Sequence, residues 1–151
     1  MYAIVGGIGS GIRDVQDVLS KTNNHVNLTS LVSTESIPCE ITICNMIKPI
    51  MSEEDWVEKI KENKNRKFVT GITTLTEMIA LKSLGYTVVY LDISWNERLN
   101  NIVENPGKIT SVNALAIWSN ATLKTELFDN LHPDISLKSS KEIADFLSKH
   151  V

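Results

Sequence analysis

The sequence predicts a three-layer α/β fold, in which a mainly parallel sheet is covered by helices on both faces. Short apolar or β-branched segments alternate with amphipathic segments along all 151 residues, which is typical of parallel strands joined by crossover helices. Hydrophobic residues make up 42% of the chain and charged residues 22%, the balance of a globular protein with a substantial core. A chain of this length is most simply one domain, residues 1–151.

The first two predicted elements are a strand and a helix. Tyr2–Val5 is a continuous apolar run, which indicates a short buried strand. Ile12–Lys21 carries Val15, Val18 and Leu19 at helical spacing, so we expect these three side chains on the inner face of the first helix.

The next part of the chain predicts two strands and a helix. Leu28–Ser33 and Ile41–Asn45 are short candidate strands separated by Pro38. A helix is predicted over Glu53–Asn63, because Ser52 is a favourable N-cap and acidic residues fill the first turn, where the helix dipole stabilises them. The apolar face of this helix comprises Trp56, Val57 and Ile60.

The middle of the chain repeats the strand–helix–strand pattern. Lys67–Gly71 is predicted as a strand, and Thr76–Leu84 as a helix that ends at Gly85, a residue type favoured just after a helix. Thr87–Ile93 is rich in β-branched and apolar residues and is the clearest strand. Ser94–Val112 has no assignment, and a stretch of that length in a compact domain either serves a function or contains a helix.

The C-terminal part predicts one more strand and two more helices. Ala114–Trp118 is the strand and Thr122–Leu131 the helix that follows it. Lys141–His150 is the last helix, capped by Ser139 or Ser140. Its inward side chains are expected to be Ile143, Phe146 and Leu147.

Charge and composition argue against several classes of partner. A net charge of −3 gives no basic footprint for nucleic acid, and no segment approaches the ~20 apolar residues of a membrane span. The N-terminal residues lack the basic and apolar regions of a secretory signal. Neither the two cysteines, Cys39 and Cys44, nor the three histidines show the spacing of a metal site. We therefore expect a cytoplasmic protein with no metal site and with neither nucleic acid nor membrane as a partner.

A glycine-rich loop joins the first strand to the first helix. Gly6-Gly7-Ile8-Gly9-Ser10-Gly11-Ile12-Arg13 has the strand–loop–helix context and the glycine spacing of a Walker A phosphate-binding loop, G-x-x-x-x-G-K-[ST]. Glycines let the backbone of such a loop surround a phosphate at the helix N-terminus. The residues predicted to contact a phosphate or nucleotide are Gly6, Gly7, Gly9, Ser10, Gly11, Ile12, Arg13 and Asp14. The structural alternative is a glycine turn that only packs a strand against a helix.

The charged groups that a Walker A loop uses are replaced in this chain. Ile12 occupies the lysine position, and Arg13 occupies the position of the hydroxyl residue that ligates Mg²⁺. Phosphoryl transfer depends on positioning and charge neutralisation, so the loss of both groups is expected to lower its rate by several orders of magnitude. Arg13 is a good phosphate ligand and would replace part of the charge for binding. An inward-pointing Asp14 would repel a nucleotide or help to hold a metal.

Two residues beyond the clearest strand are further candidates. Asp92 lies at the carboxyl end of Thr87–Ile93, where open α/β sheets place ligand contacts, and a carboxylate there could stand beside a metal. Trp95 follows it and is a candidate for stacking on a base. A strand-end cap for Asp92 and a packing role for Trp95 are the structural alternatives.

These features resemble the deoxynucleoside monophosphate kinases, a P-loop NTPase family common in bacteriophages. The family's opening pattern, G-x-x-G-S-G-K-D-T-V-A-x-x-L, is matched at Gly6, Gly9, Ser10, Gly11, Val15 and Leu19. Similar features follow mid-chain: an acidic helix with Trp56, the strand before Gly71, Glu77 and Gly85. The resemblance implies a P-loop kinase-like fold over most of the chain, although residues 23–50 and 94–112 match poorly.

The chain departs from the family where the family holds phosphates and metal. Besides the loop lysine and hydroxyl, the strand-end aspartate of the family falls on Gly71 and its arginine on Thr73. Residues 94–112, which would form the lid, contain one arginine, Arg98. No catalytic residue is therefore assigned.

The resemblance with these losses implies a degenerate kinase, or pseudokinase. Such a protein would bind a nucleotide or other phosphorylated small molecule, or a protein partner or second copy of itself, without phosphoryl transfer. The alternative is an active nucleoside or deoxynucleoside monophosphate kinase with non-standard phosphate ligands, which would act in nucleotide metabolism on ATP and a dNMP with Mg²⁺. The family's association with phages would place the protein in the host cytoplasm.

Overall fold

A five-stranded parallel sheet organises the part of the chain that this computed structural model describes, residues 1–7, 9–28, 53–104, 127 and 129–151. The strands are β1 (Tyr2–Gly6), β2 (His25–Asn27), β3 (Phe68–Thr70), β4 (Thr87–Leu91) and β5 (Ile135–Leu137). Their order is β2-β3-β1-β4-β5, and every pairing is parallel. The predicted α/β class with a mainly parallel sheet is confirmed.

The first strand lies at the centre of the sheet. Tyr2 is opposite Phe68 of β3 on one side and opposite Thr87 of β4 on the other, and the pairing with β4 continues to Gly6 opposite Leu91. The chain leaves β1 toward β2 on one side of the sheet, whereas it leaves β4 toward β5 on the other side. The carboxyl ends of β1 and β4 therefore form a topological switch point, where open α/β sheets bind their ligands.

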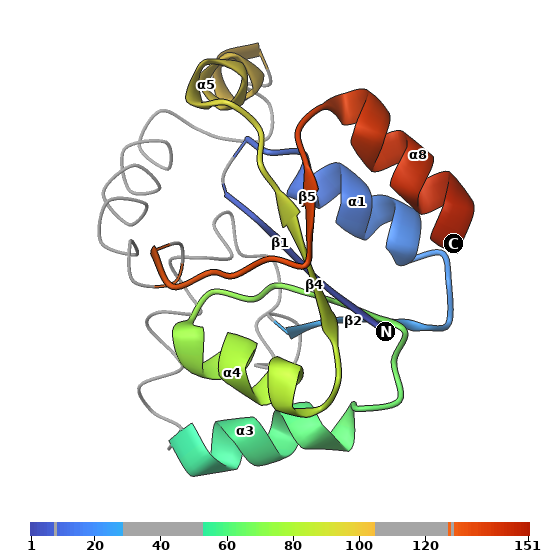
Figure 1. The fold of residues 1–151 in the computed structure, drawn as a ribbon. Coiled ribbons are helices and arrows are strands. Elements are labelled where there is room, and N and C mark those ends of the chain that lie inside the picture. The colour runs from blue at the N-terminus through green and yellow to red at the C-terminus, as the bar shows by residue number, and fades with distance from the viewer. Residues whose placement is uncertain (8, 29–52, 105–126, 128) are drawn as a thin grey trace.

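Helices lie on both faces of this sheet and beyond its carboxyl end. The described helices are α1 (Ile12–Leu19), α3 (Glu53–Glu62), α4 (Leu75–Ser83), α5 (Trp95–Glu104) and α8 (Ser140–His150). In Figure 1, α1 and α8 lie side by side against one face, α3 and α4 lie together against the other, and α5 lies beyond the end of β4.

The two faces bury two separate apolar clusters. One, below α1 and α8, joins strand residues to these helices through Ile4, Val15, Leu19, Phe68, Val89, Ile143 and Phe146. The other, below α3 and α4, comprises residues such as Ala3, Val69, Trp56, Ile60, Met78, Leu81 and Val88. The alternation of Ala3, Ile4 and Val5 between the two clusters shows that β1 is buried on both sides, as its continuous apolar run predicted.

The N-terminal elements differ from the sequence-based prediction in three respects. Helix α1 ends at Leu19 rather than Lys21, and Val18, predicted to face inward, is 40% exposed. Strand β2, His25–Asn27, was not predicted, and Leu28, the predicted start of the strand Leu28–Ser33, follows it; the rest of that predicted strand lies outside the described residues. Arg66 helps to fix this earlier strand, since its guanidinium donates to the Asn23 carbonyl just before β2.

Among the later elements, strand β5 was not predicted, and helix α5 falls in a stretch that had no assignment from the sequence. Strand β5 is short, and Asp134 fixes its start: the Asp134 carboxylate accepts from the Val88 N–H (2.8 Å), and the Asp134 N–H donates to the Val88 carbonyl (3.0 Å). Helix α5 lies inside the unassigned stretch Ser94–Val112 and begins where the Ser94 hydroxyl accepts from the Glu97 N–H.

The remaining predicted elements either agree or lie outside the described residues. β1, α3, β3, α4, β4 and α8 agree with their predicted spans to within one or two residues, and Ser139 is the cap of α8. The predicted strands Ile41–Asn45 and Ala114–Trp118 lie outside the described residues, as does most of the predicted helix Thr122–Leu131.

A buried carboxylate fixes the turn between β3 and α4. Glu77 is fully buried, and its Oε1 accepts from the backbone N–H groups of Thr73 and Thr74 (both 2.9 Å) and from their hydroxyls (3.2 and 3.0 Å). Its Oε2 accepts from the Trp56 indole N–H (2.8 Å). The Thr74 hydroxyl accepts in return from the Glu77 N–H, which completes a capping box. One side chain thus joins β3, α3 and α4.

We predict that Glu77→Gln destabilises the fold without any change of size. The amide presents N–H donors to groups that themselves donate, so the substitution should lower the free energy of unfolding by about 2 kcal/mol or more. Urea denaturation of the two proteins measures the difference. Glu58→Gln, on the exposed side of α3, is the matched control and should change stability by less than ~0.5 kcal/mol. Equal, small effects of both substitutions would contradict the structural role of Glu77.

Candidate functional site

The glycine loop leaves the sheet at its central strand and forms a tight turn. The Ser10 N–H and hydroxyl both donate to the Gly7 carbonyl (3.1 and 2.6 Å), and Ser10 is only 2% exposed. Gly9 and Gly11 have φ values of +77° and +89°, a backbone region that favours glycine. The amide of Ser10 is therefore used inside the loop in this conformation.

Helix α1 begins directly after the loop without a side-chain cap. Gly11 is its N-cap residue, and the helix hydrogen bonds begin when the Val15 N–H donates to the Gly11 carbonyl (3.1 Å). Glycine has no side chain to accept from the first-turn N–H groups of Ile12, Arg13 and Asp14. A helix start of this kind is suited to an anion, which the helix dipole also favours.

Ile12 and Arg13, at the positions where a Walker A pattern has lysine and a hydroxyl residue, have different surroundings. Ile12 is partly buried and packs against the apolar cluster below α1 and α8. Arg13 is half-buried at the second position of α1, and Asp14 is exposed beside it. Ile12 thus belongs to the core, and Arg13 is the cation of this segment.

Helix α5 packs directly on the glycine loop. A Cβ on Gly7 would lie 2.6 Å from Nη2 of Arg98, and a Cβ on Gly9 would overlap the backbone of Arg98, whose Cα would be 3.0 Å away. Asn101 Nδ2 donates to the Gly9 carbonyl (2.8 Å). The absence of a side chain at Gly9 is therefore required by packing against α5, whatever the loop binds. At Gly7 a Cβ would meet the end of the flexible Arg98 side chain, which can shift.

Sequence analysis missed this contact, although it noted Arg98 as an arginine near the expected lid. The Ser94-x-x-Glu97 pattern is a capping signature, and it would have placed a helix here with Arg98 and Asn101 one turn apart. The contact with the loop itself depends on the tertiary arrangement and has no local signal.

Asp92 and Tyr90 lie beside this contact at the end of β4. Asp92 is exposed one residue after the strand, and its N–H donates to the Leu137 carbonyl (2.8 Å), which extends the pairing with β5. Burial raises the pKa of Tyr90, the Asp92 carboxylate raises it further, and the Arg98 guanidinium opposes the shift. Asp92 and Arg98 thus lie close enough to Tyr90 to act on its pKa. Trp95 is the first residue of α5, and its side chain is outside the described part.

The structure therefore brings most of the predicted site residues together. Gly6 to Asp14 form one continuous segment at the carboxyl end of β1, except that Ile8 lies outside the described residues. Asp92 follows the neighbouring strand β4. Within the described ranges, no group of three or more His, Cys, Asp or Glu side chains is arranged to hold a metal ion.

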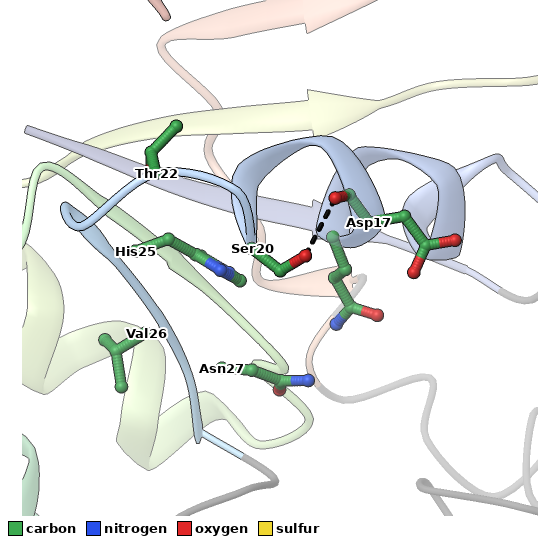
Figure 2. Close-up of a pocket in the computed structure, with 7 residues that line it drawn as sticks. Asp17, Ser20, Thr22, His25, Val26 and Asn27 are labelled. Atoms are coloured by element: carbon green, nitrogen blue, oxygen red, sulfur yellow. Dashed lines mark hydrogen bonds between the residues drawn. The ribbon is translucent and has the colours of Figure 1, made fainter.

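A shallow polar groove lies between α1 and the edge strand β2. It has a volume of about 390 Å³ and is lined by Gln16, Asp17, Ser20, Thr22, His25, Val26 and Asn27. In Figure 2, the His25 imidazole and the Asn27 amide extend from β2 toward α1, where the Ser20 hydroxyl donates to the Asp17 carbonyl. No lysine or arginine lines the groove, and Asp17 would repel an anion, so it is not suited to a phosphate.

A hydrogen-bonded cluster joins two lining residues of the groove, His25 and Gln16, to Thr70, the fully buried last residue of β3. Its hydroxyl lies 2.8 Å from His25 Nε2 and accepts from Gln16 Nε2 (3.3 Å). Burial lowers the pKa of His25 below its ordinary value of 6.5, so the imidazole is neutral at pH 7. The cluster ties β2 to β3 and α1.

Comparisons with known proteins do not place the chain in a family: no family model matches it, and no curated protein is significantly similar to it. Among the described helices, none has the length and apolar character needed to cross a membrane.

We predict that alanine is tolerated at Gly11 but not at Gly9. Both residues have positive φ, which costs an alanine roughly 1–2 kcal/mol, and a Cβ on Gly11 would meet no atom within 4 Å. At Gly9 the Cβ would also overlap the Arg98 backbone, so Gly9→Ala should cost about 3 kcal/mol or more in urea denaturation. Equal losses would show that α5 does not rest on Gly9.

We predict that His25 makes the fold sensitive to mild acid. Its pKa is lower in the folded protein than in the unfolded chain, so the unfolded chain binds the proton more readily. Stability from this group is complete above about pH 6.5 and is lost as the pH falls below it. His25→Gln should reduce the loss of stability between about pH 7.5 and about pH 5.5. His132→Gln, which alters an exposed histidine, should leave that loss unchanged; the same loss in both variants would contradict the prediction.

Proposed function

We propose that this chain is a degenerate relative of the deoxynucleoside monophosphate kinases, which binds a nucleotide or another phosphorylated small molecule at the glycine loop without transferring a phosphoryl group. The proposal depends on two features that occur together at the start of α1. The glycine loop leads into α1 with no side-chain cap, while Ile12, at the catalytic lysine position, packs in the core.

The place of the loop in the sheet supports a ligand site. It follows the central strand β1 at the switch point with β4, where the connections from the two strands diverge. Arg13 is half-buried in the first turn of α1, where a guanidinium can bind a phosphate with paired hydrogen bonds.

The positions of the other lost charges have taken structural roles. Gly71, where the resemblance expects an aspartate, has φ of +76°, and a side chain there would be strained. Thr73, where the resemblance expects an arginine, is 8% exposed, and its N–H and hydroxyl both donate to Glu77. These features support binding rather than transfer, because restoring any one charge would disturb a local interaction.

The second candidate is an active kinase with non-standard phosphate ligands. It is favoured by one observation, the Arg98 guanidinium over Gly7, which supplies a cation next to the loop that lacks its lysine. This role would require ATP, a dNMP and Mg²⁺. Binding of a protein partner, including a second copy of the chain, stays a proposal without a specific contact to support it.

We predict that the protein binds ATP or a dNMP and that Arg13→Ala weakens this binding about tenfold, because a charge-assisted hydrogen bond to phosphate is lost. Isothermal titration calorimetry measures the affinity. Lys21→Ala removes a positive charge just beyond the other end of α1 and should leave the affinity nearly unchanged.

The same samples separate the two candidate functions. With Mg²⁺, ATP and each of the four dNMPs, the binding protein should form no ADP above the rate of a buffer control. Steady ADP formation that depends on the dNMP would establish the kinase, and the absence of any binding to ATP, dNMPs or pyrophosphate would refute the proposed function.

A further inference from the structure

The groove between α1 and β2 is separate from the glycine loop. It borders the C-terminal half of α1, from Gln16 to Ser20, whereas the loop ends at Gly11, where α1 begins. At the usual rise per residue, Ser20 lies about 13 Å along the helix from Gly11. The groove has a volume of about 390 Å³, at the lower end of the range for small-molecule sites, roughly 300–1,000 Å³. It therefore has room for one small ligand, whatever the loop binds.

The hydrogen bonds around Thr70 determine which nitrogen of His25 carries the proton. The Thr70 hydroxyl is fully buried and accepts from Gln16 Nε2 (3.3 Å), and His25 Nε2 lies 2.8 Å from it. Because a buried hydroxyl donates its own proton and Gln16 presents a donor, His25 Nε2 is the acceptor of that proton. The proton of the neutral imidazole is thereby assigned to Nδ1, which makes no hydrogen bond within the described part of the chain.

The groove thus combines one neutral donor with several acceptors. The His25 imidazole extends from β2 toward α1, where the Ser20 hydroxyl donates to the Asp17 carbonyl (2.8 Å) and keeps its oxygen as an acceptor (Figure 2). The Asp17 carboxylate adds an acceptor on the same helix. Val26, which is 8% exposed, is the apolar residue of this lining.

This set of groups disfavours the ligands expected at the glycine loop. Among the described residues that line the groove, none is a lysine or an arginine, and none is a phenylalanine, a tyrosine or a tryptophan. A phosphate is bound by cations and helix N-termini, and a nucleobase is commonly stacked on an aromatic side chain. Hydroxyl groups suit the lining better, because each can donate to an acceptor such as Ser20 and accept from His25 Nδ1.

We propose that this groove binds a neutral polyhydroxylated molecule of about one sugar ring, whose hydroxyls donate to Ser20 and Asp17 and accept from His25 Nδ1, while its C–H groups contact Val26. The groove is shallow and offers few hydrogen bonds, so the affinity is expected in the millimolar range. The proposal does not depend on the glycine loop, and the two sites are tested with different ligands.

Two serines with the same local geometry provide the test. The Ser20 hydroxyl donates to the carbonyl three residues earlier at the end of α1, and the Ser83 hydroxyl does the same at the end of α4, where it donates to Ala80 (2.6 Å). Both serines are exposed, and only Ser20 lines the groove among the two. Ser20→Ala should weaken binding about fivefold, as expected for the loss of one hydrogen bond, and Ser83→Ala should leave the affinity unchanged.

NMR titrations of the isotope-labelled full chain with D-glucose, D-ribose and myo-inositol measure these affinities. The amide resonances of Ser20, Val26 and Asn27 should shift in a saturable manner with at least one of the three. In the free protein, the imidazole nitrogen resonances of His25 should show a proton on Nδ1 and none on Nε2, and the Nδ1 resonance should shift when the polyol binds.

The opposite results would overturn the proposal. These are no saturable shift at the groove with any of the three polyols, an equal effect of the two serine substitutions, or a proton on His25 Nε2 in the free protein. Tighter binding of glucose phosphate than of glucose at the same amides would also contradict it, because the described lining has no lysine or arginine. None of these results bears on ATP or pyrophosphate at the glycine loop, so the proposed function stands or falls on its own titration.

Discussion

The parallel pairing of β1 with β4 determines where every candidate functional group lies. All five residues of β1 pair with β4, from Tyr2 opposite Thr87 to Gly6 opposite Leu91. Because the two strands are parallel and in this register, both end at the same level of the sheet. The glycine loop after β1 and the residues that lead into α5 after β4 are then forced side by side. The contact of Arg98 with Gly7 and Gly9 follows from this register, since a shift of two residues would carry α5 about 7 Å along the strand direction.

The glycines of the loop meet two kinds of requirement, one conformational and one steric. Gly11 has a positive φ and open space around its Cα, so its requirement is conformational. Gly9 combines a positive φ with a steric requirement, because its Cβ would overlap the Arg98 backbone. A Cβ on Gly7 would meet the end of the Arg98 side chain, which is flexible and can shift. A Cβ on Gly6 would meet the Ser10 hydroxyl and Leu91, which is a further steric requirement. A glycine pattern typical of a phosphate-binding loop is therefore also explained by backbone conformation and packing. Both explanations require glycine at the same positions.

The sequence was sufficient for the layers of the fold because its signals there are local and strong. The apolar run of β1 and the β-branched residues of β4 are buried on both sides as expected. The capping patterns Thr74-x-x-Glu77 and Ser139-x-x-Glu142 begin α4 and α8. The signals fail where an element is too short to show a period. His25–Asn27 and Ile135–Leu137 have three residues each, and both owe their strand geometry to partners far along the chain, such as Thr70 and Val88.

For the candidate site, the sequence located the loop but not what lies on it. The Gly6–Asp14 segment could be found because its glycine spacing is a local pattern. For the same reason, the sequence shows that Ile12 stands where the Walker A pattern has its lysine. The helix that packs on the loop, α5, could not be found in this way, because it is far from the loop in sequence. Asn101 and Gly9 are separated by 92 positions. Single-sequence patterns carry no information on such pairs.

The position at which a Walker A pattern has its lysine is occupied in this chain by an apolar residue, Ile12, that packs in the core. A lysine at position 12 would have to take its ammonium out of the cluster that Ile12 joins with α8, or else remain there at a large desolvation cost. The fold gains apolar contact from Ile12 and needs no charge there. A charge next to the loop comes instead from Arg98 of α5, a helix that lies beyond the end of β4 (Figure 1).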